Sequence, residues 1–234
     1  RWHDLTFADS DRKMARLERL QKALEQRRTI RELAGNPLLL TMVAILNRNQ
    51  ELPRNRVKLY HEASKVLLHK WDVDEKDKLV YKDLNPDIFD EEVKQAICRQ
   101  IAYRMQSGEK GLRGNVIEKE ALRESIAEVL VGLVGDKAAT YAKWMVEQLR
   151  TRGFSLCWLG GNQEDYYAFV HRTFLEYFCA WAFVWQFEKE RSIDLEYLKA
   201  EVFGKHWQDE SWHEVLRLMA GMLDGKFAGE VIEF

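Results

Sequence analysis

One interruption in an otherwise helical sequence constrains the fold of this chain more than any other feature. Residues 153–159 form a short apolar run typical of a β-strand, and residues 166–170 form a second one. Between the two runs stands Gly160-Gly161-Asn162, which is a strong turn signal. A β-hairpin is therefore predicted over 154–170. The chain of 234 residues holds only 3 Pro and 13 Gly, so long helices are expected elsewhere.

Apolar residues recur at steps of three and four on both sides of the hairpin, which is the spacing of helices with one buried face. Helices are predicted over 9–28, 37–46, 54–71, 91–107, 118–134, 137–152, 171–189, 194–206 and 211–224. The helix that begins at Pro37 is apolar all round and is expected to be buried all round. Three helices followed by a β-hairpin is the element order of a winged helix.

The order of these elements predicts a mainly α protein: a helical bundle, a winged-helix domain with one β-hairpin, and a C-terminal helical segment. The polar stretch 72–90 contains Asn85-Pro86 and is interpreted as a connector. The predicted parts are a helical domain at 1–75, a connector at 76–90, a winged-helix domain at 91–187 with its hairpin at 154–170, and the start of a second helical domain at 188–234.

Composition excludes several classes of protein. The net charge of −2 offers no electrostatic basis for bulk binding of nucleic acid or of anionic membranes. Three cysteines are too few for a disulfide framework, so free thiols in a reducing cytoplasm are expected. No apolar run is long enough to span a membrane. Eight Lys or Arg against four Asp or Glu in 9–31 are interpreted as a solvated helix face, with a docking surface as the second interpretation.

Several segments come close to a catalytic motif, but each lacks a residue that the motif requires. The Gly-Lys pairs at 204–205 and 225–226 lack the earlier Gly and the final Ser or Thr of a phosphate-binding loop. His61-Glu62 opens like a zinc motif, but Lys65 stands where the second His would bind. Ser155 lies in a near match to GxSxG whose last position is Cys157. We predict no catalytic residue, no metal site and no enzymatic activity for this chain.

Two other segments point to ligand binding. The first is Gly35-Asn36-Pro37, where the proline suits the first turn of a helix because its missing N–H costs nothing there. The second centres on His171, between the strand at 166–170 and the next helix. Unpaired N–H groups collect at a helix N-terminus and favour anions, so this position suits a phosphate contact. A packed or capping role is the competing interpretation of His171.

Together the two segments resemble the second half of a NACHT-type STAND NTPase, the nucleotide switch of NLR immune receptors and of many bacterial multidomain proteins. Leu33-Ala-Gly-Asn-Pro37-Leu-Leu-Leu40 is similar to the GxP motif, whose proline packs on adenine. Phe169-Val-His171-Arg-Thr-Phe-Leu-Glu176-Tyr-Phe-Cys-Ala180 is similar to the winged-helix motif, whose histidine contacts the β-phosphate of ADP. The resemblance covers about 29–224.

The resemblance implies a regulatory role in defence or signalling, with Pro37 and His171 as the nucleotide-binding residues. The Walker A and Walker B segments are not in this chain, and they are expected before Arg1 in a P-loop NTPase core of the same polypeptide. ADP or ATP is expected in that full-length parent, and none is expected to bind tightly to this chain alone. The resemblance also implies sensor repeats after Phe234 and oligomerisation on activation. Because the chain begins without Met, it is expected to be a fragment of a longer protein.

Two alternatives stay open at this point. One is a DNA-binding winged-helix regulator, in which the helix at 137–152 reads the duplex with Lys137, Lys143, Arg150 and Arg152. Asp136, Trp144, Glu147 and the net charge of −2 weigh against it, so nucleic acid is not the expected partner. The other is a helical protein-interaction scaffold that binds no nucleotide.

Overall fold

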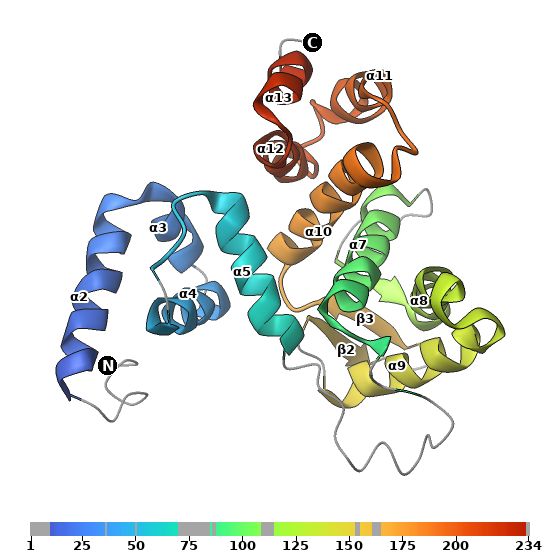
Figure 1. The fold of residues 1–234 in the computed structure, drawn as a ribbon, viewed down its shortest axis with the longest axis horizontal. Coiled ribbons are helices and arrows are strands. Elements are labelled where there is room, and N and C mark those ends of the chain that lie inside the picture. The colour runs from blue at the N-terminus through green and yellow to red at the C-terminus, as the bar shows by residue number, and fades with distance from the viewer. Residues whose placement is uncertain are drawn as a thin grey trace. The chain divides into compact units, whose positions relative to one another are not determined.

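The computed structural model describes residues 10–35, 37–49, 51–69, 85, 88–108, 115–152, 155–160 and 165–232. The chain divides into two compact units, Arg1–Val66 and Leu67–Phe234, and each is described by itself (Figure 1). The expected connector at 76–90 falls largely outside the described residues, so the expected domain boundaries stay predictions. No helix in the described part of the chain combines the length and the apolar character needed to cross a membrane.

The first unit is a small helical bundle. Its helices are α2 (Ser10–Gln26), α3 (Arg28–Ala34), α4 (Pro37–Asn49) and the first part of α5 (Arg56–His69). The predicted helices over 9–28, 37–46 and 54–71 are thus confirmed within the described residues, whereas α3 was not predicted. Its core contains Leu20, Ile30, Met42, Val43, Leu59 and Tyr60.

The helix that begins at Pro37 is not buried all round. Met42 and Val43 lie in the core, but Leu40 is 36% exposed. The expectation was wrong because it came from composition alone. The described helices of this small bundle pack on the side of α4 that carries Met42 and Val43, and not on the side that carries Leu40.

The second unit begins with a winged helix (Figure 1). Its elements in order are α7 (Glu91–Ser107), β1 (Ile117–Glu118), α8 (Lys119–Val134), α9 (Ala138–Arg152), β2 (Leu156–Gly160) and β3 (Tyr166–Phe169). The strands form one antiparallel sheet in the order β1-β3-β2. The predicted helices and hairpin are confirmed. The two-residue strand β1, where Ile117 pairs with Tyr167, was not predicted, because so short a strand has no periodicity to detect.

Local signals in the sequence explain where these elements begin and end. Asp90 caps α7 by accepting a hydrogen bond from the backbone N–H of Val93 at 2.9 Å. Gly135 ends α8 with a φ of 55°, a conformation that favours glycine. Gly160, with a φ of 81°, ends β2 at the predicted turn. The core beneath the sheet contains Ile97, Ile101, Leu122, Ile126, Leu130, Leu149 and Tyr167.

The helices that follow the wing extend the same core. They are α10 (Arg172–Trp185), α11 (Leu195–Tyr197), α12 (His213–Met222) and α13 (Gly225–Ile232), with π-helical turns at Gln186–Glu190 and Leu198–Gly204. The long aromatic helix α10 packs against both α7 and α12. The predicted helices over 171–189, 194–206 and 211–224 correspond to these elements, and α13 was not predicted. The chain is therefore mainly α with a small antiparallel sheet, as expected.

Candidate functional site

His171 occupies the junction between the wing and the long helix. It follows β3, has an extended backbone with φ −154° and ψ 141°, and is the N-cap residue of α10. Its ring Nδ1 accepts a hydrogen bond from the backbone N–H of Thr173 at 3.2 Å, and the Thr173 hydroxyl lies 2.7 Å from the same nitrogen. The capping role considered from the sequence is therefore present in the structure.

This cap fixes which ring nitrogen of His171 carries the proton. A nitrogen that accepts a hydrogen bond has no proton of its own, so the neutral ring is protonated at Nε2. Partial burial lowers the pKa of His171 below its ordinary value of 6.5, which favours the neutral ring. Among the described residues, no group hydrogen-bonds to Nε2. The side chain thus offers one N–H donor beside a helix N-terminus.

The backbone that leads to His171 is held by several hydrogen bonds. The side-chain amide of Asn115 donates to the carbonyl of Phe169, and the backbone N–H of Phe169 donates to Asn115 Oδ1 at 3.0 Å. The backbone N–H of Val170 donates to the carbonyl of Ser155 at 3.0 Å. Phe169 and Phe174, which flank the junction, are buried in the core. The position of the imidazole is therefore set by the fold on both sides.

The neighbouring cation Arg172 is engaged elsewhere. Its Nε donates to Glu176 Oε1 at 3.0 Å, one helical turn along α10. Its Nη2 donates to the backbone carbonyl of Ser211 at 3.3 Å, which links α10 to the segment before α12. Arg172 therefore ties α10 to the segment before α12. The His171 ring offers an N–H donor beside it.

Pro37 is the first residue of α4 and is exposed. Its carbonyl accepts a hydrogen bond from the Thr41 hydroxyl at 2.9 Å, so the proline stands at an ordinary helix start. Asn36 lies outside the described residues. Pro37 belongs to the first unit and His171 to the second, so the structure describes no site that they share. A common nucleotide between them stays a prediction.

The structure describes the helix expected to read DNA in the alternative interpretation. Trp144 and Met145 of α9 are 3% and 5% exposed, so they are packing residues. Lys143 is exposed, but Glu147 is exposed one turn further along. The side chains of Arg150 and Arg152 lie outside the described residues. The described outer face of α9 is thus not a basic surface.

Metal and thiol chemistry find no support in the described residues. No group of three or more His, Cys, Asp or Glu side chains among them is arranged to hold a metal ion. All three cysteines are free thiols. Burial raises the pKa of Cys98 to about 12 and raises the pKa of Cys179 as well, so both stay protonated at neutral pH.

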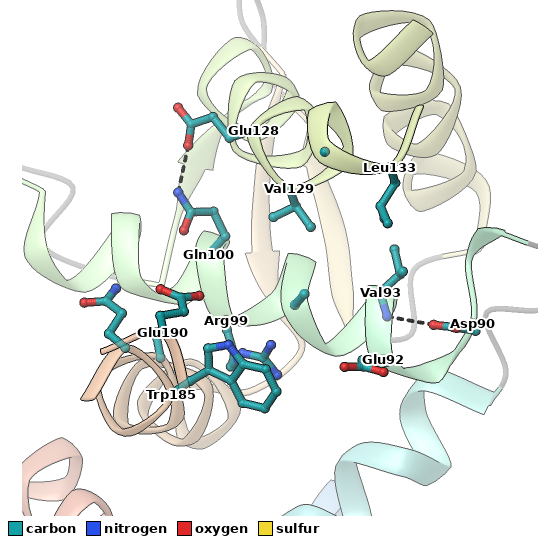
Figure 2. Close-up of a pocket in the computed structure, with 14 residues that line it drawn as sticks. Asp90, Glu92, Val93, Arg99, Gln100, Glu128, Val129, Leu133, Trp185 and Glu190 are labelled. Atoms are coloured by element: carbon teal, nitrogen blue, oxygen red, sulfur yellow. Dashed lines mark hydrogen bonds between the residues drawn. The ribbon is translucent and has the colours of Figure 1, made fainter. Parts of the chain in front are cut away.

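Sequence reasoning missed a second candidate site in the winged-helix unit. A pocket of about 700 Å³ lies between α7, α8 and the end of α10 (Figure 2). Figure 2 shows the Trp185 ring lying against Arg99 in this pocket. Nothing in the sequence marks Arg99, because one basic residue on a helix is ordinary and its tryptophan neighbours lie more than 80 positions away.

One comparison with known proteins gives a match. The family model described as "Winged helix-turn-helix domain C-terminal to NACHT" matches residues 56–183, which is more than half of the chain. The match includes the whole winged helix and most of α10, and so contains both His171 and Arg99. No curated protein and no solved structure matches this chain.

Proposed function

This chain belongs to the family of winged helix-turn-helix domains C-terminal to NACHT, and from that premise we propose that it is the regulatory part of a nucleotide switch. In this proposal a P-loop NTPase core elsewhere in the same polypeptide binds ADP or ATP. The winged helix contacts the bound ADP through His171 and thereby stabilises a closed state. The closed state is released when the nucleotide changes.

The Nε2–H donor of His171 is the observation that carries this proposal. The ring is held by the Thr173 cap through Nδ1, so Nε2 points its proton away from the helix backbone. A phosphate oxygen that meets this donor also meets the positive end of the α10 dipole. The neutral ring favoured by burial still donates, so the contact does not require an acidic pH.

A phosphate contact of this kind would serve a switch rather than a reaction. A nucleotide biases a conformational equilibrium only through contacts that differ between the two states. A hydrogen bond to a charged group typically contributes about 1.5–3 kcal/mol, which shifts such an equilibrium by roughly ten- to a hundred-fold. We assign no catalytic step to this chain, and the nucleotide is the ligand of the full-length parent.

Pro37 is proposed to complete the nucleotide contact from the adenine side. Its ring is exposed at the start of α4 and is fixed in direction by the helix that follows. A compact apolar ring at such a place suits packing against the face of a base. This part of the proposal is supported by the GxP resemblance and by the exposure of Pro37.

The test of the proposal separates the phosphate contact of His171 from its capping role. Asn and Asp are both strong N-cap residues, so His171→Asn and His171→Asp preserve the start of α10. Both replacements remove the Nε2 donor, and Asp adds a negative charge that repels phosphate. In the full-length protein we expect ADP affinity to fall about ten-fold or more for Asn and further for Asp.

Melting temperature is measured on the same preparations, because a stability defect alone could lower nucleotide binding. Thr173→Val is the matched control, since it removes the hydroxyl contact and leaves the ring donor in place. If His171→Asn and His171→Asp both melt like the parent and keep its ADP affinity, His171 acts only as a helix cap and the proposal is overturned.

A further inference from the structure

The pocket between α7, α8 and α10 lies far from His171. His171 caps the N-terminus of α10, whereas the pocket is lined by Trp185 at the other end of that helix, about 20 Å away at 1.5 Å per residue. The two sites are therefore separate places in the same unit. Apolar side chains from all three helices line the pocket: Val93, Ala96, Val129, Leu133 and Ala182.

Arg99 is the unusual residue of this pocket. It is only 6% exposed, and its guanidinium carbon lies 4.1 Å from the ring centroid of Trp185 and 4.7 Å from that of Trp181. Its N–H groups form no hydrogen bond and no salt bridge with any described residue. Burial lowers the pKa of Arg99 to about 10, so the charge is only partly compensated by its surroundings.

Two carboxylates act on the guanidinium without pairing with it. Glu190 and Glu92 both favour the charged form of Arg99, yet neither forms a salt bridge with it among the described contacts. The other two acidic residues of the lining are engaged. Asp90 caps α7, and Glu128 accepts a hydrogen bond from Gln100 at 2.7 Å (Figure 2).

Buried guanidinium donors normally have partners, because leaving a charged donor unsatisfied costs more than an ordinary hydrogen bond contributes. Arg99 instead lies in the lining of an accessible pocket, whose other residues are mainly apolar or acidic. A polyanion such as a nucleic acid would meet four carboxylates at the same place. A ligand that combines a carboxylate with a nearby positive charge and an apolar group meets all three parts of the lining.

We propose that this pocket binds a polypeptide segment of a partner protein in which an acidic side chain stands beside basic and apolar ones. The acidic carboxylate pairs with the guanidinium of Arg99. A basic side chain of the same segment pairs with Glu92 or Glu190, and the apolar one packs against Val129 and Leu133. The volume of about 700 Å³ suits several side chains rather than a single ion.

The probe for this site is the peptide acetyl-Lys-Glu-Leu-Lys-amide, compared with the same peptide carrying Gln in place of Glu. Binding to the whole chain is followed by NMR through the side-chain Nε–H resonance of Arg99, which is assigned by its loss in Arg99→Lys. We expect the Glu peptide to move this resonance and to bind at least about ten-fold more tightly than the Gln peptide. Equal affinity of the two peptides, or no shift at any soluble concentration, would overturn the proposal.

Substitutions at the rim give a test that does not depend on the fold of an Arg99 variant. Glu92 and Glu190 are exposed, so Glu92→Gln and Glu190→Gln are expected to leave the melting temperature unchanged. Each substitution should weaken the binding of the Glu peptide by about three-fold, which is the effect of losing an exposed ion pair. Each should also strengthen the binding of acetate, added as its sodium salt.

Arg123→Gln is the matched control, because Arg123 is an exposed arginine of α8 whose side chain pairs with Glu120 outside this pocket. This substitution should change neither the affinity for the Glu peptide nor the affinity for acetate. Tripolyphosphate that binds more tightly than the Glu peptide would show a site for phosphate anions instead, and would equally overturn the proposal.

Discussion

The side chain of Asn115 hydrogen-bonds both backbone groups of Phe169. Its amide donates to the Phe169 carbonyl, and its Oδ1 accepts from the Phe169 N–H at 3.0 Å. Asn115 precedes β1, and Phe169 is the last residue of β3, so the pair acts like an additional rung of the sheet. Because Phe169 stands two positions before His171, this pair fixes the place at which α10 begins.

Asn115→Ala should destabilise the chain more than its partly exposed position suggests. The substitution leaves two backbone groups of the buried Phe169 without their partner, and each unsatisfied group costs about 1–3 kcal/mol. We expect the free energy of unfolding in urea to fall by roughly 2–4 kcal/mol. Gln100→Ala, which removes an exposed hydrogen bond to Glu128, is the control and should cost less than about 1 kcal/mol. A loss at Asn115 no larger than the control would contradict this role.

Stability should depend on pH through His171. Its pKa in the folded chain lies below the ordinary 6.5 because burial disfavours the charged ring. The unfolded chain therefore binds more protons below pH 6.5, and the stabilisation present above that pH is lost as the pH falls toward the folded pKa.

Urea unfolding between pH 8 and pH 5, on the parent chain and on His171→Asn, measures this effect. The variant should lose less stability on acidification than the parent. His206, whose pKa is also lowered by burial, contributes in the same direction and is present in both proteins, so it cancels in the comparison. Identical pH profiles for the two proteins would show that His171 titrates normally.

The start and end of the long helices could be predicted from local residues, and the short or irregular elements could not. Asp90 and Gly160 carry their structural roles in their own chemistry, so capping and turn rules apply to them directly. The strand β1 and the helix α13 are held by tertiary pairing and packing, which a pattern in a single sequence does not contain. His171 was found because its motif is local. Arg99 was missed because its partners Trp181 and Trp185 lie on another helix.

Gly132 within α8 and Gly135 directly after it should respond to alanine with opposite signs. Gly135 has φ 55° and ψ −130°, a region that other residues rarely adopt, so Gly135→Ala should destabilise the chain by about 1–3 kcal/mol. Gly132 lies within the helix, and a Cβ there would meet nothing within 4 Å. Gly132→Ala should therefore stabilise the chain by about 0.5–1 kcal/mol. Thermal unfolding of both variants checks the pair, and a shift of the same sign in both would show that α8 does not end at Gly135.

The winged helix should not bind duplex DNA with sequence preference. A reader helix needs exposed side chains that reach base edges and cations that contact phosphates. On α9 the bulky side chains of Trp144 and Met145 are buried, and the exposed Lys143 is followed one turn later by the exposed Glu147. A fluorescence anisotropy titration with random duplexes should show only weak binding that disappears as salt rises. Lys143→Ala should weaken that residual binding equally for all sequences, because a phosphate contact carries no base information. The contrary result would be sub-micromolar binding at physiological salt that prefers one duplex and is lost in Lys143→Ala. It would show that α9 reads DNA, and it would favour the DNA-binding alternative over the nucleotide switch.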